Sequence, residues 1–223
     1  EGKQAAGARL GFDDNFCGDH MKSGNAIPLA NTGDLARLAG NIAQTDGDYT
    51  TQIPALMVYR RSAATDPMPC IYGLGLGITV QGCKRVTLGD EIFDYGPGQA
   101  LVTSVDLPVA SYVTRADSVE PYLGVRLELD GRVIGQVAAE MDFAAPLKAP
   151  ASRAMSVVAL DEGLLDALTR LLRLLDEPRL IPLIVPLIQQ EIVVRLLNGE
   201  HGPTLRHLVT AGAPGQHIAK VIA

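Results

Sequence analysis

The sequence predicts an α+β protein in which antiparallel β-strands precede a helical segment. Between Tyr49 and about Val158 the apolar runs are short, rich in β-branched and aromatic residues, and separated by Gly, Pro and Asp. Runs of this kind, with turn residues between them, are typical of an antiparallel barrel or sandwich. After Val158, leucine and isoleucine recur every three or four residues, which is the period of a helix packed on a core.

Length, charge and hydropathy limit the function classes. The 223 residues suffice for one large domain, or for a domain and a smaller appendage. With 25 acidic and 19 basic residues the net charge is −6, whereas a nucleic-acid reader normally carries a basic stripe. No apolar run approaches the ~20 residues that span a membrane. We therefore expect a cytoplasmic protein that contacts neither a membrane nor, through this chain alone, DNA.

The N-terminal part is expected to be a tail followed by a short helix. Residues 1–33 are rich in glycine and lack periodicity, so we expect a flexible tail, part of which derives from cloning. From Asp34 to Ala43 the apolar residues recur at helical spacing, and Asp34 is placed to cap this helix. The Asp46-Gly47-Asp48 segment then predicts a turn.

Seven strands are expected in the β-rich part, each bounded by turn residues. They are Ile53–Arg60, Cys70–Gln81, Lys84–Leu88, Glu91–Tyr95, Gln99–Ser104, Val109–Arg115 and Tyr122–Leu129.

The strand expected over Cys70–Gln81 carries three glycines in alternation. Gly73, Gly75 and Gly77 do not fit the dinucleotide fingerprint, which needs Gly-x-Gly-x-x-Gly between a strand and a helix. In a strand they share one face with Thr79, while leucine and β-branched residues occupy the other face. A face without side chains needs a reason, either a close approach of backbone or room for a ligand. The sequence leaves both explanations open.

Two longer helices are expected after the strands. A leucine stripe runs from Leu164 to Leu175, and a second apolar stretch runs from Ile181 to Leu197. A further short helix is expected over Thr204–Ala211. Because the second stretch is apolar on most of its circumference, it should be buried on two sides, either inside one subunit or against a second copy of the chain. The residues expected at a dimer interface are Leu168, Leu172, Leu175, Ile188, Ile192 and Leu196.

Several short segments recur together in one known family. The segments are Ile53–Arg60, Gln81-Gly82-x-Lys84-Arg85-Val86-x-Leu88-Gly89, Tyr95-x-Pro97, Ser104-Val105-Asp106-Leu107-Pro108-Val109 and Pro121-Tyr122-Leu123. Over roughly residues 34–223 the chain resembles the N-terminal region of AraC-type transcriptional regulators. This resemblance implies a cupin-like antiparallel β-barrel that binds an effector over residues 34–158, and a helical segment that forms a homodimer over residues 159–216.

The end of the chain is similar to another part of that family. Residues 217–223 resemble the start of the region that holds the paired helix-turn-helix motifs. The resemblance therefore implies that DNA is bound only through a C-terminal domain that is missing here.

An enzymatic function is not expected. A metal-binding cupin needs several imidazole ligands on its strands, but the histidines are His20, His201, His207 and His217, none of which lies between residues 49 and 158. No Ser-His-Asp or Cys-His set can be placed in the β-rich part either. We expect no catalytic residue, no metal site and no cofactor.

A sensor instead needs polar groups around an apolar space. The candidate ligand-binding residues are Arg60, Arg61, Thr65, Asp66, Arg85, Tyr112 and Arg115, together with Gly75 and Gly77. An arginine pair recognises anions and stacks on flat bases, and Asp66 could accept hydrogen bonds from a guanine edge. These features suggest a guanine cyclic dinucleotide such as c-di-GMP as the effector. The alternative is that Arg60 and Arg61 alternate between the two faces of a strand end, with Asp66 as a turn residue.

Two other functions stay open at this point. Cys70 and Cys83 are expected to be reduced, and a thiol beside Lys84 and Arg85 could react with an aldehyde, although a purely structural cysteine explains them as well. Alternatively, the chain is a dimerisation scaffold without a ligand. A ligand-sized cavity beside Gly75 and Gly77 would distinguish a sensor from a scaffold.

Overall fold

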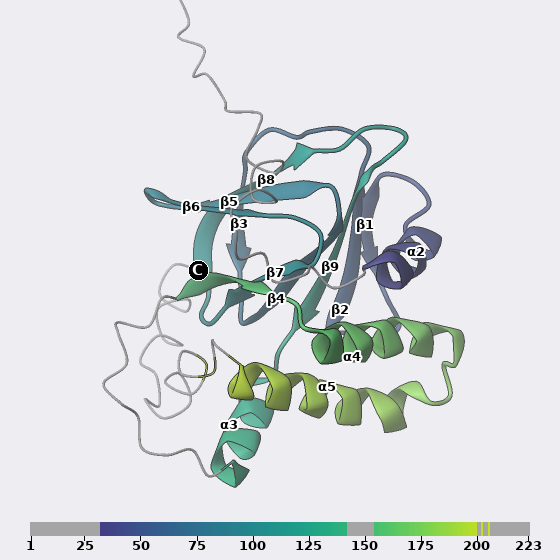
Figure 1. Cartoon of the computed structure of the whole chain (residues 1–223), viewed down its shortest axis with the longest axis vertical. Coiled ribbons are helices and arrows are strands. Elements are labelled where there is room, and N and C mark those ends of the chain that lie inside the picture. The colour runs from purple at the N-terminus through teal and green to yellow at the C-terminus, as the bar shows by residue number, and fades with distance from the viewer. Residues whose placement is uncertain (1–31, 142–153, 200–201, 203–204, 206–223) are drawn as a thin grey trace, which may run out of the picture.

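The computed structural model describes residues 32–141, 154–199, 202 and 205. Within these residues the chain forms two antiparallel β-sheets with helices packed on one of them (Figure 1). The α+β class and the order of strands before the two long helices are as predicted. The expected tail before residue 32 and the expected start of a DNA-binding region over residues 217–223 lie outside the described residues.

The two sheets contain six and four strands. In spatial order, the larger sheet consists of β1 (Gly47–Thr50), β2 (Leu56–Arg61), β9 (Tyr122–Glu128), β4 (Gly75–Gln81), β7 (Gln99–Thr103) and β10 (Met155–Ala159). The smaller sheet consists of β3 (Met68–Tyr72), β8 (Leu107–Arg115), β5 (Cys83–Leu88) and β6 (Glu91–Tyr95). No strand ladder joins the two sheets within the described residues, so the architecture is that of two facing sheets and not of a closed barrel.

Helices cover the outer face of the larger sheet. The helices are α2 (Gly33–Ile42), α3 (Gly131–Glu140), α4 (Glu162–Arg173), followed by a 3₁₀ turn over Leu174–Asp176, and α5 (Ile181–Asn198). Leu76, Ile78 and Val80 of β4 are buried in one core with residues of all four helices. The opposite face of the same sheet points toward the smaller sheet, because side chains alternate along a strand.

The glycine-rich segment forms two strands where one was predicted. The expected strand over Cys70–Gln81 is interrupted at Gly73 and Leu74, so that β3 belongs to the smaller sheet and β4 to the larger one. A side chain at Gly73 would begin 3.0 Å from the Asp106 carboxylate. The missing side chain thus provides room for the crossing between the sheets.

Three elements were not predicted. The Asp46-Gly47-Asp48 segment does not form only a turn, because Gly47–Thr50 pairs with β2 as β1. Helix α3 follows Asp130-Gly131, which is also a turn signal, and Asp130 caps the helix by accepting from the amide of Arg132 at 2.8 Å. Strand β10 is specified by its long-range pairing with β7.

Of the short helix predicted over Thr204–Ala211, only Leu205 is among the described residues, and it is helical and buried.

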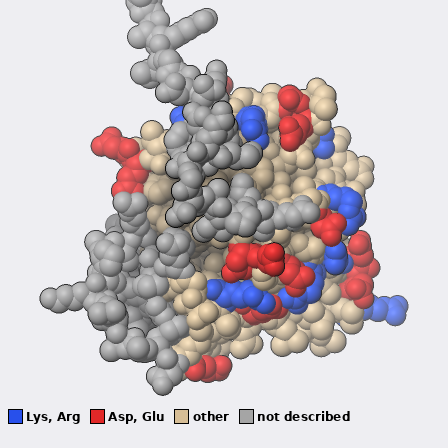
Figure 2. Space-filling model, in the orientation of Figure 1, with Lys and Arg blue, Asp and Glu red and all other residues tan. Residues whose placement is uncertain are grey.

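Ion pairs tie α4 to its neighbours. Glu191 of α5 accepts from Arg170 of α4 at 2.5 Å and from Arg195 at 2.7 Å, and Arg173 pairs with Asp34 of α2 at 3.2 Å. Figure 2 shows acidic and basic side chains lying together over this helical face. Helix α5 has the length and mean hydropathy, 1.3, of a membrane-spanning helix, but here it packs on α3 and α4.

Candidate ligand-binding site

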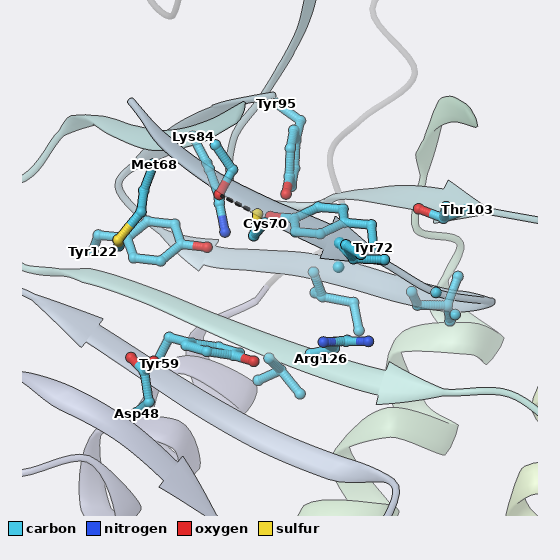
Figure 3. A pocket seen from close by; sticks show the side chains of 18 of the residues that line it. Asp48, Tyr59, Met68, Cys70, Tyr72, Lys84, Tyr95, Thr103, Tyr122 and Arg126 are labelled. Atoms are coloured by element: carbon cyan, nitrogen blue, oxygen red, sulfur yellow. Dashed lines mark hydrogen bonds between the residues drawn. The ribbon is translucent and has the colours of Figure 1, made fainter. Parts of the chain in front are cut away.

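A cavity of about 270 Å³ lies between the two sheets. It is lined by residues from each of the strands β1 to β9, so that both sheets form its walls. Figure 3 shows the side chains that converge there. The polar and aromatic ones include Asp48, Tyr59, Arg61, Tyr72, Lys84, Tyr95, Thr103, Ser111, Tyr122 and Arg126.

Strand alternation decides which side chains enter the cavity. On β2, Tyr59 and Arg61 line it, whereas Arg60 lies on the helical side and donates to the carbonyl of Ala43 at 3.5 Å. On β5, Lys84 lines the cavity, while the next residue, Arg85, lies on the other face of the sheet. Both neighbouring pairs of cations are therefore divided between the two faces of a strand.

The two glycines on the inner face of β4 have different explanations: close approach of backbone at Gly75 and space for a ligand at Gly77. A side chain at Gly75 would begin 2.5 Å from the backbone oxygen of Leu127, so close backbone approach explains this glycine. A side chain at Gly77 would begin 3.3 Å from the hydroxyl of Tyr95. Because Tyr95 and Gly77 both line the cavity, the missing side chain at Gly77 adds space for a ligand.

Lys84 is surrounded by tyrosines. Its Nζ lies 5.6 Å from the ring centre of Tyr72, 5.8 Å from that of Tyr59 and 5.9 Å from that of Tyr122. At these distances the negative face of an aromatic ring attracts a cation. The largest single influence on the pKa of Lys84 is burial, which lowers it. The surrounding tyrosine oxygens together outweigh burial and hold this pKa well above its ordinary value. Lys84 therefore carries its positive charge at neutral pH.

Three of the cavity tyrosines, Tyr59, Tyr95 and Tyr122, are neutral in the same range. Burial raises the pKa of Tyr95 well above its ordinary value, and it also raises the pKa of Tyr59 and Tyr122. The positive charge of Lys84 opposes this rise in all three cases. Their hydroxyl groups are therefore available as hydrogen-bond donors and acceptors beside a charged ammonium group.

The other two cations of the cavity are paired with carboxylates. Arg61 lies 2.5 Å from Asp48 and donates to the carbonyl of Gly47 at 2.9 Å. Arg126 lies 3.2 Å from Glu128. No ion-pair partner of Lys84 is found among the described residues. The cavity thus has one positive charge that no neighbouring carboxylate neutralises.

The ligand-binding residues predicted from the sequence are dispersed. Arg61, Gly75 and Gly77 line the cavity, whereas Arg60, Thr65, Asp66, Arg85, Tyr112 and Arg115 do not. Arg85 holds Asp94 through two hydrogen bonds of 2.6 and 2.8 Å. Thr65 accepts from the amide of Val113 at 3.0 Å, and Asp66 and Arg115 are exposed.

Sequence reasoning missed the residues at the centre of the cavity. The sequence predicts Lys84 as a strand and motif residue and as a neighbour of Cys83, but not as a ligand-binding residue. It also does not predict that Tyr59, Tyr72, Tyr95 and Tyr122 converge. The alternation of side chains along β5 could have indicated Lys84, because Lys84 and Val86 share one face of the strand and Val86 is fully buried. That signal does not show which other strands face this one.

The two cysteines considered as reactive groups differ in position. Cys70 is a free thiol that lines the cavity, and it donates to the hydroxyl of Ser111 at 3.7 Å. Cys83 is buried, does not line the cavity and is disulfide-bonded, contrary to the expectation of a reduced thiol. Within the described residues, no three His, Cys, Asp or Glu side chains are placed to hold a metal ion.

The residues predicted for a dimer interface lie inside the protomer. Leu168, Leu172, Ile188, Ile192 and Leu196 are buried in the core shared by the larger sheet and the helices. Leu175 is partly buried against the same core. The opposite face of α5 instead exposes apolar side chains, of which Leu183 is 67% and Leu187 is 61% exposed.

Two facing antiparallel sheets with a polar cavity between them, backed by helices, define an α+β domain. The family model described as the AraC-type transcriptional regulator N-terminus matches residues 52–204. The chain therefore belongs to this family, as the sequence resemblance predicted. Such regions generally bind an effector and dimerise, and the family is one of regulators and not of enzymes.

Two solved structures are similar to the chain. The first, the apo form of a ToxT variant from Vibrio cholerae strain SCE256, has a TM-score of 0.41 and 4% identity, with 62% of this chain and 57% of that chain covered. The second, the AraC-like transcriptional activator CuxR, has a TM-score of 0.38 and 13% identity, with 74% of this chain and 62% of that chain covered. The match thus spans about three fifths of each of these proteins. No curated protein matches the sequence.

Proposed function

We propose that this chain is the effector-sensing and dimerisation part of an AraC-type transcriptional regulator. A small-molecule effector binds between the two sheets, which act as the cupin-like unit of the domain. Binding then changes the placement of the two subunits, and with them the C-terminal DNA-binding domains, in the cytoplasm. The observation that carries this proposal is the cavity of about 270 Å³ on which Lys84, Arg126 and several tyrosines converge.

The size of the cavity favours a small effector. Pockets for drug-sized ligands measure roughly 300–1,000 Å³, so a cavity of about 270 Å³ suits a smaller metabolite. A guanine cyclic dinucleotide remains the alternative suggested by Arg60 and Arg61. It would need to lie largely outside the cavity. Its arginine contacts would also compete with existing ion pairs, because Arg61 pairs with Asp48 and Arg60 lies 3.7 Å from Asp46.

Thermal unfolding of the chain against two ligand panels tests the sensing function. One panel holds cyclic and linear guanine nucleotides, and the other holds sugars, aldehydes and carboxylic acids with their neutral analogues. At ~100 times its Kd, an effector adds about 2.7 kcal/mol of stability. The matched variant is Gly77→Val, which fills the cavity beside Tyr95, and the control is Gly131→Ala, whose new methyl group would lie 3.7 Å from Leu74.

Two results contradict parts of this proposal. A chain that no compound of either panel stabilises is a dimerisation scaffold without a ligand. An effector that stabilises the chain but leaves promoter binding by the full-length regulator unchanged has no regulatory role. In contrast, a stabilisation that Gly77→Val removes and Gly131→Ala keeps supports binding in the cavity.

The dimer surface we propose is the exposed apolar stripe of α5. Leu180, Leu183, Leu187 and Val194 are spaced by three, four and seven residues, which places them along one side of the helix. This side is opposite to the buried one that contains Ile188 and Ile192. A second copy of the chain would cover these leucines, as dimerisation in this family leads one to expect.

Sedimentation velocity of two charge variants tests this surface. Leu187→Glu places a charge at the centre of the stripe and should shift a dimer toward monomer by at least about tenfold in Kd. Val119→Glu is the control, because Val119 is a 92% exposed apolar residue in the loop between β8 and β9. A dimer that Leu187→Glu leaves unchanged uses another surface.

A further inference from the structure

The side chain of Lys84 lines the cavity, and no counter-ion for its ammonium group is found among the described residues. Figure 3 shows its nitrogen directed into the space between the side chains of Tyr72, Tyr95 and Tyr122. Three tyrosine ring centres lie 5.6 to 5.9 Å from Nζ, and the hydroxyl groups of Tyr72 and Tyr95 also act on it. Ring faces stabilise a cation, but they do not neutralise its charge.

The tyrosines keep Lys84 charged, but no carboxylate among the described residues pairs with it. A charge taken out of water is normally paired and hydrogen-bonded in a folded protein. Among the described residues, the carboxylate that lines the cavity is that of Asp48, and it is held by Arg61 at 2.5 Å. A ligand with one negative charge would supply the partner that the described residues do not supply to Lys84.

The rest of the lining indicates the chemistry of such a ligand. The hydroxyl groups of Tyr72, Tyr95 and Ser111 and the guanidinium group of Arg126 line the same cavity as Lys84, and both oxygens of a carboxylate need hydrogen-bond donors. Aromatic rings and the bare position at Gly77 offer room for a flat or slender apolar group. The volume of about 270 Å³ limits that group to a small one.

We infer that the effector is a small organic monocarboxylate whose carboxylate pairs with Lys84 and whose apolar part lies over Gly77. This inference rests on the proposed effector-binding function of the cavity, and it adds the chemical class of the effector and the residue that selects it. Lys84 discriminates between a carboxylate and its neutral analogue, because only the carboxylate neutralises the ammonium group.

The test compares carboxylates with their amides. Benzoate and benzamide, and butyrate and butyramide, form pairs of similar shape that differ in charge. Binding is followed by tyrosine fluorescence, since the chain has six tyrosines and no tryptophan and four of the tyrosines line the cavity. Protection of Cys70 from alkylation reports independently whether a bound compound occupies the cavity.

Three variants test whether the charge of Lys84 causes the preference for a carboxylate over its amide. Lys84→Met removes the charge at similar length and should weaken carboxylate binding at least about tenfold while leaving amide binding unchanged. Lys84→Arg keeps the charge and should retain the preference for the carboxylate. Arg179→Met removes an exposed cation between α4 and α5 and should change neither affinity. Circular dichroism of each variant establishes that it is folded.

The outcomes separate this inference from the proposed function. A carboxylate preference of at least about tenfold in the unmodified chain, lost in Lys84→Met and kept in Lys84→Arg, supports the inference. Equal binding of acid and amide overturns it, as does a preference that survives in Lys84→Met. If only the amides protect Cys70, the inference fails and the sensing function stands. If no compound protects Cys70 or changes the fluorescence, both fail.

Discussion

The ring of Tyr122 lies in the space that the missing side chain of Gly124 provides on β9. The two residues are two positions apart and therefore share the face of β9 that points into the cavity. A methyl group at Gly124 would overlap the hydroxyl group of Tyr122 and lie only 2.8 Å from its ring carbon Cζ. A glycine within a central strand thus sets the position of one of the tyrosine rings around Lys84.

Gly124→Ala should displace the Tyr122 ring into the cavity. We expect a loss of about 1–3 kcal/mol in the free energy of unfolding, because the buried ring must leave its packed position. We also expect at least about tenfold weaker effector binding, because the displaced ring occupies part of the cavity. Gly40→Ala is the control, because its methyl group would lie 3.7 Å from Leu123 and Gly40 lies in α2. That variant should gain about 0.5–1 kcal/mol. Equal urea midpoints for the two variants would contradict this role of Gly124.

Gly75→Ala and Gly77→Ala should have different effects. At Gly75 the new methyl group meets the backbone of β9, 2.5 Å from the Leu127 oxygen, so we expect a loss of about 1–3 kcal/mol in stability. At Gly77 it meets the end of the Tyr95 side chain at 3.3 Å, so stability should fall by less than about 1 kcal/mol while effector affinity falls. Urea unfolding and ligand titration of both variants check this, and the reverse order would show that the two glycines were assigned the wrong roles.

The cavity tyrosines should make the protein sensitive to high pH. The pKa values of Tyr59, Tyr95 and Tyr122 are raised in the folded state, so their contribution to stability is present below the ordinary tyrosine pKa, about 10. It is lost as pH rises through the folded-state values. Near-UV absorbance of tyrosinate should therefore show part of the tyrosines ionising only with unfolding.

Lys84→Met supplies the matching comparison for the alkaline titration. The positive charge of Lys84 lowers the pKa of all three tyrosines, so its removal should move their ionisation to still higher pH in the folded protein. Arg179→Met should leave the titration curve unchanged. A curve that shifts to lower pH in Lys84→Met would mean that the ammonium group does not face these rings.

Glu191→Gln should weaken the attachment of α5 to α4. The guanidinium groups of Arg170 and Arg195 hold the pKa of Glu191 below its ordinary value. Its contribution to stability is therefore present above the ordinary glutamate pKa and lost as pH falls through the lower, folded-state value. Because these side chains are about one third exposed, we expect a loss of only about 0.5–1 kcal/mol at neutral pH.

Urea unfolding at neutral and acidic pH checks the expectation for Glu191. The variant and the unmodified chain should differ at neutral pH and converge once Glu191 is protonated. Glu177→Gln, at an exposed position after α4, should match the unmodified chain at both pH values. A difference that persists in acid would assign the effect to packing and not to charge.

The sequence by itself determined the class of the fold and the faces of its elements. Alternation along β4 placed Leu76, Ile78 and Val80 on one face and the glycines on the other, as observed. Helical periodicity located α4 and α5 to within a few residues. These features are local, because the period of side chains along a strand or helix depends only on backbone geometry.

The tertiary structure alone decided how the strands are combined. The glycine-rich segment continues without a strong break in sequence, yet its two halves join different sheets because β3 pairs with β8 and β4 with β9 and β7. The same pairings bring Tyr59, Tyr72 and Tyr122 around Lys84 from four separate strands. Contacts between residues so far apart in the chain follow from sheet pairing and core packing, which periodicity within one segment cannot specify. For this reason the sequence predicted a sensor, but only the folded chain placed a charged lysine at the centre of its cavity.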